Sequence, residues 1–514
     1  MSFIVCPKKF WLKFNEPELT AAENANTKLR FHQGHEVGKV ALALFPGIVN
    51  AQLMKEDNTL DMGAMCKKTK ALIEDNCPAI AEAAFSGEGA YCAVDVLKNN
   101  GDGTWDLYEV KSAVSCKDYY LPDIAFQRYV LTCCGIKVKQ SNVIYINREY
   151  VRNGDIEPDK LFIIEEVSER LNEFTEEIPE QLKQAHALYE SETEPSIDIS
   201  KGCGDCEFWC HCSRHLPKNN IFSLYNLWYK FDHYKKGIIS FEDILKSDIK
   251  LDEIQQRQID FELNDIPPHI DKPKIREFLE QINFPIYFLD FETINPCLPS
   301  HDGIRPYQKV PFQYSLHILK SKNEELEHKE FLADENKNEY RALAEQLIKD
   351  IPADGGSIIG YNAGFEKGVI TKMAAIFPNL EDRLNYMRSR IVDLYQVFRK
   401  GYFHNKAMDN FSLKSILPAL FPDNPDLDYS ANEDVHDGME ASAAFLYLKD
   451  QPPQERERIR TNLLKYCRLD TFAMVSIYQK LCLQTEENNS SPTKAETTEE
   501  TNFNIIKQKT EKTK

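Results

Sequence analysis

The stretch Pro285-Ile-Tyr-Phe-Leu-Asp-Phe-Glu-Thr293 decides the fold of this chain and indicates its chemistry. Its apolar, β-prone first half predicts a strand, in which successive side chains alternate between the two faces of a sheet. Asp290 and Glu292 would therefore project from one face, while Phe291 points into the core. Two buried carboxylates on one face repel each other and lose hydration unless a cation compensates them. The pattern favours a ligand pair for a divalent metal ion, and a solvated strand end is the alternative.

Length and composition limit the class of protein. A chain of 514 residues is too long for one core and suggests about two to four domains. No apolar run approaches the ~20 residues of a membrane span, and the first residues lack the layout of a signal peptide. We therefore expect a soluble cytoplasmic protein without a membrane partner, in which clustered cysteines among the 14 bind metal. The net charge of −19 argues against a uniformly basic DNA-binding surface, but it leaves room for a local basic groove.

A β-hairpin is predicted from two strands, residues 90–97 and 105–112, joined by a turn rich in Asn and Gly. The hairpin brings Asp95 opposite Glu109, with Lys111 on the same face as Glu109. Acids in this arrangement can hold Mg²⁺ beside a phosphate, and the lysine can position or activate the attacking water. A surface hairpin with an ordinary Glu–Lys pair is the alternative.

The segment after the hairpin extends this pattern. It predicts a helix from Asp123, with Gln127 one turn further on, and then a strand at residues 141–147. This order resembles the RecB-like nucleases of the PD-(D/E)XK superfamily, with Val94 in place of the proline of that name. The resemblance implies one or two Mg²⁺ or Mn²⁺ ions held by Asp95 and Glu109, and catalytic roles for Lys111 and Gln127.

The cysteines form a second cluster of candidate ligands. Cys203, Cys206 and Cys212 follow the pattern Cys-x2-Cys-x5-Cys, with Cys210 inside it, and Cys6 lies near the start of the sequence. Four thiolates can hold Zn²⁺ or a cubane cluster, and the spacing alone favours zinc. The pattern resembles the iron–sulfur RecB-type nucleases, which implies a 4Fe–4S cluster on Cys6, Cys203, Cys206 and Cys212 that joins the two ends of the nuclease domain. Cys210 could replace one of these ligands, Zn²⁺ is the alternative cofactor, and simple burial is expected for Cys92, Cys116, Cys133 and Cys134.

Two later segments supply further acids. Residues 357–366 predict a buried strand that ends in a Tyr-Asn turn and enters a helix at Glu366. Residues 463–474 predict a late helix that places Tyr466 and Asp470 one turn apart on one face. Together with the Asp-x-Glu strand, this set resembles the DEDD-type exonucleases of the ribonuclease H-like fold, in the subclass with tyrosine. Glu366 departs from that pattern, where Asp is usual, and the extra methylene changes its reach to a second metal ion.

This resemblance implies a two-metal mechanism. Two ions, Mg²⁺ or Mn²⁺, about 3.5–4 Å apart stabilise the attacking and leaving oxygens of in-line phosphodiester cleavage. Asp290 would bridge both ions, and Glu292, Glu366 and Asp470 would complete their coordination. Tyr466 would orient the attacking water, which is a geometric task for a phenol of pKa near ~10. Four unrelated acids in a large acidic protein are the alternative.

Several other polar residues have two interpretations each. His35 and Glu36, within a helical run from Asn26 to Leu44, could reach a metal ion or form a polar helix face. His436 and Asp437 could approach the acids or cap a helix, and Arg305 could contact a phosphate or belong to an ordered loop.

The whole arrangement resembles a bacterial domain-of-unknown-function family that fuses a RecB-like domain to a ribonuclease H-like domain. The expected α/β organisation is a restriction-endonuclease-like nuclease domain at 1–216, a helical connector at 217–283, an exonuclease domain at 284–484 and a disordered, polar tail at 485–514. Within the connector, Phe222–Tyr229 has helical periodicity, and Ser240 or Asp243 could cap a helix.

These patterns and resemblances imply a metal-dependent nuclease whose partner is a nucleic acid, with DNA favoured over RNA. The C-terminal domain would carry a 3′–5′ exonuclease site and the N-terminal domain a second nuclease site. In a first alternative only one site is active and the other domain is a DNA-binding platform. In a second, the protein is a non-catalytic iron–sulfur scaffold that binds nucleic acid.

Overall fold

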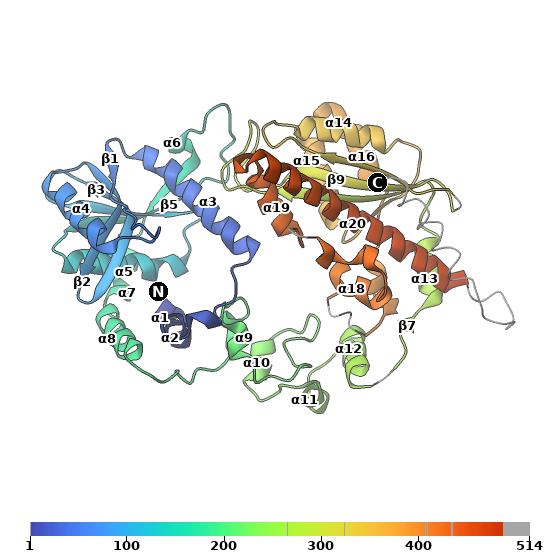
Figure 1. Ribbon diagram of the computed structural model, residues 1–514, viewed down its shortest axis with the longest axis horizontal. Coiled ribbons are helices and arrows are strands. Elements are labelled where there is room, and N and C mark those ends of the chain that lie inside the picture. Colours follow the sequence, from blue (N-terminus) through green and yellow to red (C-terminus); the bar gives the residue numbers. More distant parts are fainter. Residues whose placement is uncertain are drawn as a thin grey trace.

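The computed structural model describes residues 2–264, 266–322, 324–406, 408, 410–432 and 435–486. Two lobes, each built on one β-sheet, stand side by side and are joined below by short helices and loops (Figure 1). No helix within these ranges is both long and apolar enough to cross a membrane. The tail expected from residue 485 lies outside the described residues, apart from Thr485 and Glu486, which end the last helix.

The N-terminal lobe is organised around a six-stranded sheet whose strands follow one another in chain order. Strands β2, β3 and β4 are antiparallel neighbours, and β4 pairs with β5 in parallel. The predicted hairpin, the helix after it and the returning strand are confirmed. The strands are β1 (Ile48–Asn50), β2 (Ala79–Gly87), β3 (Ala90–Asn99), β4 (Trp105–Lys111), β5 (Val138–Ile146) and β6 (Phe162–Glu166). The helices are α1 (Ser2–Val5), α2 (Pro7–Asn15), α3 (Ala25–Ala41), α4 (Met62–Glu74), α5 (Leu121–Cys133), α6 (Pro158–Leu161), α7 (Asn172–Thr175) and α8 (Ile178–Tyr189).

The connector holds short helices rather than long ones: α10 (Lys230–Tyr234), α11 (Phe241–Lys246), α12 (Glu253–Leu263) and α13 (Lys272–Leu279). The helix predicted over Phe222–Tyr229 is wrong, because Asn226 and Tyr229 adopt left-handed backbone conformations with φ of 47° and 57°. The predicted cap is confirmed, since Ser240 and Asp243 form a reciprocal capping box at the start of α11.

The C-terminal lobe contains a five-stranded mixed sheet in the order β10-β9-β8-β11-β12. Strands β8, β9 and β10 are antiparallel neighbours, whereas β11 runs parallel to both β8 and β12. The strands are β8 (Ile286–Ile294), β9 (Val310–Leu319), β10 (Glu327–Leu332), β11 (Ile358–Gly360) and β12 (Ile391–Asp393), and a separate two-stranded ladder joins β7 (His269–Ile270) to β13 (Phe403–His404). The helices are α14 (Tyr340–Asp350), α15 (Gly364–Ile376), α16 (Glu381–Ser389), α17 (Gln396–Arg399), α18 (Leu413–Leu420), α19 (Gly438–Leu446) and α20 (Pro453–Glu486).

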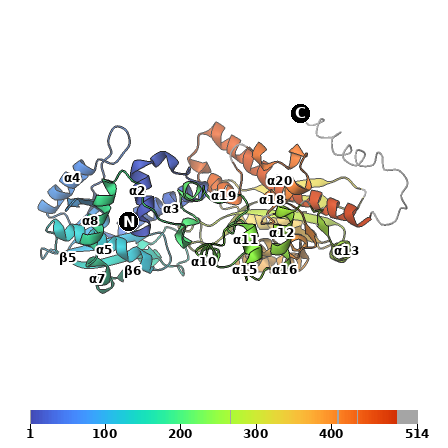
Figure 2. The same ribbon diagram turned by 90° about the horizontal axis from the view of Figure 1, so that it is seen from below.

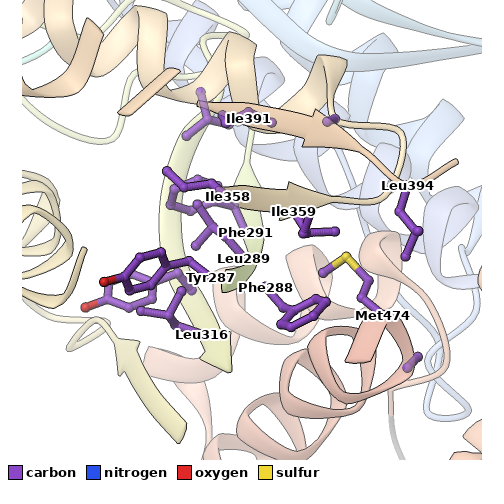
Figure 3. Close-up of a cluster of buried hydrophobic side chains, with 14 of the residues drawn as sticks. Tyr287, Phe288, Leu289, Phe291, Leu316, Ile358, Ile359, Ile391, Leu394 and Met474 are labelled. Carbon is purple, nitrogen blue, oxygen red and sulfur yellow. The ribbon is translucent and has the colours of Figure 1, made fainter. Parts of the chain in front are cut away.

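Strand β8 lies in the middle of this sheet and in the core of the lobe. Phe288 and Leu289 are completely buried and point to opposite faces, as the alternation of a strand requires. Figure 3 shows Phe288 directed toward Met474 of α20, on the face that the acids of β8 share. Helix α20 therefore covers the acidic face of β8, and its apolar packing brings this helix close to the two carboxylates.

A row of buried polar side chains fixes the position of α20 on the sheet. Gln313, Ser315 and His317 of β9 lie opposite the residues of β8 that face α20. The Gln313 amide donates to the Leu463 carbonyl at 2.8 Å, and the Thr471 hydroxyl lies 2.8 Å from both Ser315 Oγ and His317 Nδ1. Buried polar groups lose free energy without partners, so these bonds favour one register of the helix over others.

Two regions of contact between the lobes are the loop that follows β8, which meets residues 112 and 149–154, and the pair of helices α3 and α19. The Arg152 guanidinium donates to the carbonyls of Pro299 and Ser300 at 3.0 Å each, and Tyr307 donates to the Ser112 carbonyl. In the second contact α3 packs against α19, and Figure 2 shows these helices next to each other at the junction. The loop that follows β8 therefore contacts Ser112, the residue immediately after β4, and so connects the two sheets.

Candidate metal centres

Four carboxylates converge in the C-terminal lobe, from three elements that are far apart in the sequence. Asp290 and Glu292 come from β8, Glu366 from the first turn of α15, and Asp470 from α20. Glu292, Glu366 and Asp470 all raise the pKa of Asp290 by their charge, after the larger effect of burial. Glu366 is only 2% exposed, and Glu292 and Asp470 are 6% and 8% exposed. The structure thus brings together all four acids of the sequence pattern.

The local fold explains why Glu366 reaches the acids of β8. Strand β11 runs parallel to β8, so the helix that follows β11 begins at the sheet edge where the acids of β8 lie. The turn between them needs a left-handed residue, and Asn362 supplies it with φ of 60°. Asp393 at the end of β12 accepts the Ala363 backbone N–H at 3.1 Å. A Cβ on Gly360 would lie 3.2 Å from Glu366 Oε2, so glycine leaves the space that this carboxylate occupies.

Burial raises the pKa of all four acids, and repulsion from other acids of the set adds to this rise for Asp290 and Glu292. Burial raises the pKa of Glu366 to about 8 and that of Asp470 to about 7. The pKa values of Asp290 and Glu292 also rise well above their usual range, mainly through burial and then through the charge of Asp470. Without a cation, the folded protein therefore carries a cluster of acids that resist ionisation.

The donor atoms fit a divalent cation. Glu366 Oε2 is buried and has no hydrogen-bond partner among the described residues. One donor atom each from Asp290, Glu292 and Cys467 lie within 4.8 Å of one another, and no other such group of three occurs in the described part of the chain. A mainly carboxylate set suits Mg²⁺ or Mn²⁺, and positive charge there would satisfy the unpaired oxygen of Glu366.

Three residues that the sequence patterns missed contact this cluster or act on it. The Tyr429 hydroxyl donates to Asp470 Oδ1, and the Cys467 thiol donates to Asp290 Oδ2 at 3.5 Å. Lys414 lies with its ammonium 5.9 Å from the centre of the Tyr429 ring, and its charge lowers the pKa values of Glu292 and Asp470 against the larger effect of burial. Lys414 makes no ion pair among the described residues. Only Cys467 carries a sequence signal, since it lies between Tyr466 and Asp470.

Tyr466 and Asp437 lie beside the same acids. Tyr466 is 6% exposed, and burial followed by the charge of Asp470 raises its pKa far above the usual range. The phenol therefore stays neutral, as its expected geometric role requires. Asp437 caps α19 by accepting two backbone N–H groups at 2.9 Å, and its charge also raises the pKa of Glu292, so both interpretations of Asp437 hold. His436 is exposed and lies 3.0 Å from Glu440.

The four predicted residues of the N-terminal lobe also meet. Glu109 accepts from Lys111 Nζ at 2.5 Å through one oxygen and from Gln127 Nε2 at 2.9 Å through the other. Asp95 Oδ2 accepts the Val110 backbone N–H at 2.7 Å, and Lys111 also lies 3.7 Å from Asp123. Both oxygens of Glu109 thus have protein partners already. Gln127 Oε1, however, is buried and has no hydrogen-bond partner among the described residues, as is also the case for Glu366 Oε2.

The shifted pKa values in the N-terminal cluster are nevertheless typical of a catalytic or metal-binding site. Burial raises the pKa of Glu109 to about 7 and that of Asp95 to about 6. Burial lowers the pKa of Lys111, but the Glu109 carboxylate outweighs it and raises the value to about 12. The sequence patterns missed a third acid, Glu82 of β2, whose charge raises the pKa of Asp95 further. Glu82 adopts a left-handed backbone conformation with φ of 53°.

The predicted cysteine ligands gather where the ends of the N-terminal lobe meet. Cys6 caps α2 by accepting the Lys9 backbone N–H at 3.4 Å, and Lys9 Nζ pairs with Glu207 at 2.7 Å. The Cys212 thiol has a pKa raised by burial, and Cys203, Cys206 and Cys6 all contribute to this rise. All four thiols are free and half-buried, whereas Cys210 at the start of α9 (Trp209–Cys212) is exposed.

Several of the remaining expectations need correction. Cys92 is buried as expected and Cys116 is half-buried, but Cys133 and Cys134 are exposed at the end of α5. His35 is exposed and Glu36 bonds Lys39 at 2.9 Å, which favours a polar helix face over a metal site. Arg305 pairs with Glu149 of the other lobe at 2.8 Å, which favours the ordered-loop interpretation.

The chain contains a domain of unknown function, DUF2779, whose family model matches residues 287–412. The match begins in β8 and includes three of the four converging acids, namely Asp290, Glu292 and Glu366. It ends before Lys414, Tyr429 and α20. No curated protein and no solved structure matches the chain.

The acid cluster predicts a response of stability to pH and metal. Acids whose pKa is raised on folding favour the folded state at low pH, and this stabilisation is lost as pH rises through the folded pKa values of about 7 and 8. Millimolar Mn²⁺ should therefore raise the melting temperature by several degrees at about pH 8.5 and by much less at about pH 6. Asp470→Asn should raise the metal-free melting temperature at the higher pH and abolish the response to Mn²⁺.

Differential scanning calorimetry of the C-terminal transition checks this result. Glu457→Gln is the matched control, because Glu457 is an exposed acid on the same helix. A response to Mn²⁺ that survives in Asp470→Asn, or that Glu457→Gln abolishes equally, contradicts the prediction.

Proposed function

We propose that the protein is a metal-dependent nuclease, with a two-metal 3′–5′ exonuclease site in the C-terminal lobe. The observation that carries this proposal is the convergence of Asp290, Glu292, Glu366 and Asp470, with an unpaired buried oxygen on Glu366. A mixed sheet in which β8 is central and α20 crosses its acidic face supports a ribonuclease H-like fold for this lobe. Nucleic acid, with DNA favoured over RNA, is the proposed substrate, and a cytoplasmic location stays a prediction.

Two divalent ions, Mg²⁺ or Mn²⁺, would supply stabilisation of the attacking and leaving oxygens when bound. Asp290 would hold both ions, and Glu292, Glu366 and Asp470 would each hold one. Tyr429 donates to Asp470 and so keeps that carboxylate in one orientation. Neutral Tyr466 would orient the attacking water by a hydrogen bond.

Lys414 would contact the phosphate that is cleaved. Its ammonium lies over the Tyr429 ring beside the acids, and it has no carboxylate partner within ion-pair distance among the described residues. A lysine in this position is free to bind an anion that approaches the metal ions, and it offsets charge that develops on the phosphate oxygens.

The N-terminal lobe would be a second, PD-(D/E)XK-type nuclease, with Asp95 and Glu109 as ligands for one or two ions. Lys111 would act on the attacking water and Gln127 would orient Glu109. Both oxygens of Glu109 already accept a hydrogen bond, so a metal ion there would share this carboxylate with Lys111 and Gln127. This observation favours the alternative in which the N-terminal lobe binds DNA and only the C-terminal site cleaves it.

Separate substitutions in the two lobes test the proposal. With Mn²⁺ and a 3′-labelled single-stranded DNA, Asp290→Asn should lower the rate of nucleotide release by about 10²-fold or more, since it removes the shared ligand. Lys414→Met should lower kcat by about 10²-fold with a smaller change in KM. Lys111→Ala should leave 3′ release unchanged and should affect only cleavage that persists in Asp290→Asn.

Lys349→Met is the matched control for Lys414→Met, because Lys349 is an exposed lysine on α14. Undiminished 3′ release from Asp290→Asn rejects the C-terminal site. Binding of DNA that is insensitive to divalent metal, with no product under any metal, supports instead the non-catalytic scaffold.

The four half-buried thiols support a 4Fe–4S cluster, with Zn²⁺ as the alternative; no three of these sulfur atoms lie within 4.8 Å of one another in the structure. When bound, either group would join α2 to residues 203–212 and so close the ends of the N-terminal lobe. Ligand thiolates need low pKa values, and the positive charge of the bound group would reverse the rise that burial causes at Cys212.

The visible spectrum of anaerobically purified protein distinguishes the two cofactors. An iron–sulfur cluster predicts a broad absorbance band at the blue end, and Cys203→Ser should remove most of it, whereas Cys210→Ser should retain it. A colourless protein that contains zinc would contradict the cluster and retain the thiolate site.

A further inference from the structure

A pocket of 520 Å³ lies between the cysteine segment, residues 200–216, and the connector. One wall comes from the cysteine segment through Gly204, Trp209 and Ser213, and the other comes from residues 217–231. The full lining is Gly204, Trp209, Ser213, Leu216, Pro217, Lys218, Asn220, Phe222, Ser223, Lys230 and Phe231. This volume falls within the range of small-molecule sites, which is roughly 300–1,000 Å³.

The lining combines aromatic rings with lysines. Trp209 and Phe222 meet edge to face with centroids 5.4 Å apart, and Phe231 lies 5.1 Å from Phe222. Lys218 and Lys230 both line the pocket, and none of the lining residues is acidic. In a chain with a net charge of −19, a pocket with two cations and no anion favours a negatively charged occupant.

Lys230 is held in the pocket without a carboxylate partner. Its ammonium donates to the Phe222 carbonyl at 2.9 Å, and no ion pair involves Lys230 or Lys218 among the described residues. Burial lowers the pKa of Lys230, which means that folding keeps this cation partly dehydrated. A half-buried lysine with donors to spare is suited to bind the oxygens of a phosphate.

We propose that this pocket binds one nucleotide, with its base against the aromatic rings and its phosphate at Lys218 and Lys230. Base stacking on aromatic side chains beside lysines is a general mode of binding to unpaired strands, and it needs no particular sequence. Trp228 and Tyr229, which directly precede Lys230, are 72% and 69% exposed. These rings give neighbouring bases further surface for stacking, so an unpaired strand is the favoured source of the nucleotide, and a free nucleotide is the other.

The pocket would depend on the cofactor at the cysteines. Gly204 and Trp209 lie between Cys203 and Cys212, so whatever the thiols bind also fixes one wall. This nucleotide site belongs to neither acid cluster. It therefore adds a strand-binding site to the proposed nuclease without resting on catalysis by either lobe.

Fluorescence anisotropy tests the proposal. It measures the binding of a short fluorescein-labelled oligothymidylate to the full chain in the presence of EDTA. Lys230→Gln keeps a donor for the Phe222 carbonyl, and Lys218→Gln changes an exposed residue, so both variants should fold. Each variant should weaken binding about tenfold. Each should also reduce the salt dependence of the binding constant by the amount expected for about one phosphate contact. Lys235→Gln is the control, because Lys235 is exposed just after α10 and outside the pocket lining, and it should bind as the unaltered protein does.

Competition and activity distinguish the remaining outcomes. Displacement by free thymidine monophosphate at the same sites identifies a free nucleotide as the ligand, and displacement by unlabelled strand alone identifies the strand. Equal binding by all variants, an equal loss in Lys235→Gln, or no binding by the unaltered protein overturns the proposal. Lys230→Gln should release nucleotide from a dinucleotide substrate at the same rate as the unaltered protein. If the nuclease proposal fails, neither the unaltered protein nor any variant forms product, and this outcome is distinct from a loss of oligothymidylate binding.

Discussion

Repulsion among four carboxylates, three of them buried and one half-buried, is the constraint on which the C-terminal lobe depends. Glu292, Glu366 and Asp470 are buried and Asp290 is half-buried, and the charges of the first three raise the cost of ionising Asp290. Tyr429, Cys467 and Lys414 offset part of this repulsion, and a bound cation would offset more of it. The oxygen of Glu366 that lacks a partner is the local sign of this imbalance.

Strand pairing and buried hydrogen bonds hold these acids together. Strand β8 presents two of them from the centre of the sheet, and the parallel strand β11 delivers α15 to the same edge. Helix α20 is fastened through Thr471 to Ser315 and His317, so Asp470 cannot slide away without breaking buried hydrogen bonds. In the N-terminal lobe, by contrast, Lys111 offsets part of the repulsion between Glu109 and Asp95, although burial still raises the pKa of Glu109 to about 7.

Sequence patterns were sufficient where chemistry and local structure coincide. Alternation along β8 and helical spacing along α20 identified Asp290, Glu292, Tyr466 and Asp470, because each motif lies within one element. Lys414 and Tyr429 were missed because only the tertiary fold brings them to the acids. The turn conformations at Asn226 and Tyr229 overrode the apolar periodicity that had predicted a helix in the connector. Other acids, such as Glu82 and Asp393, act on their neighbours through strand pairing that no short motif reveals.

Anomalous diffraction from crystals grown with Mn²⁺ tests the central claim most directly, because it locates the ions independently of activity. We expect two peaks about 3.5–4 Å apart, with Asp290 bridging them and with Glu292, Glu366 and Asp470 completing their coordination. A single peak elsewhere, or none among these carboxylates, would contradict the account.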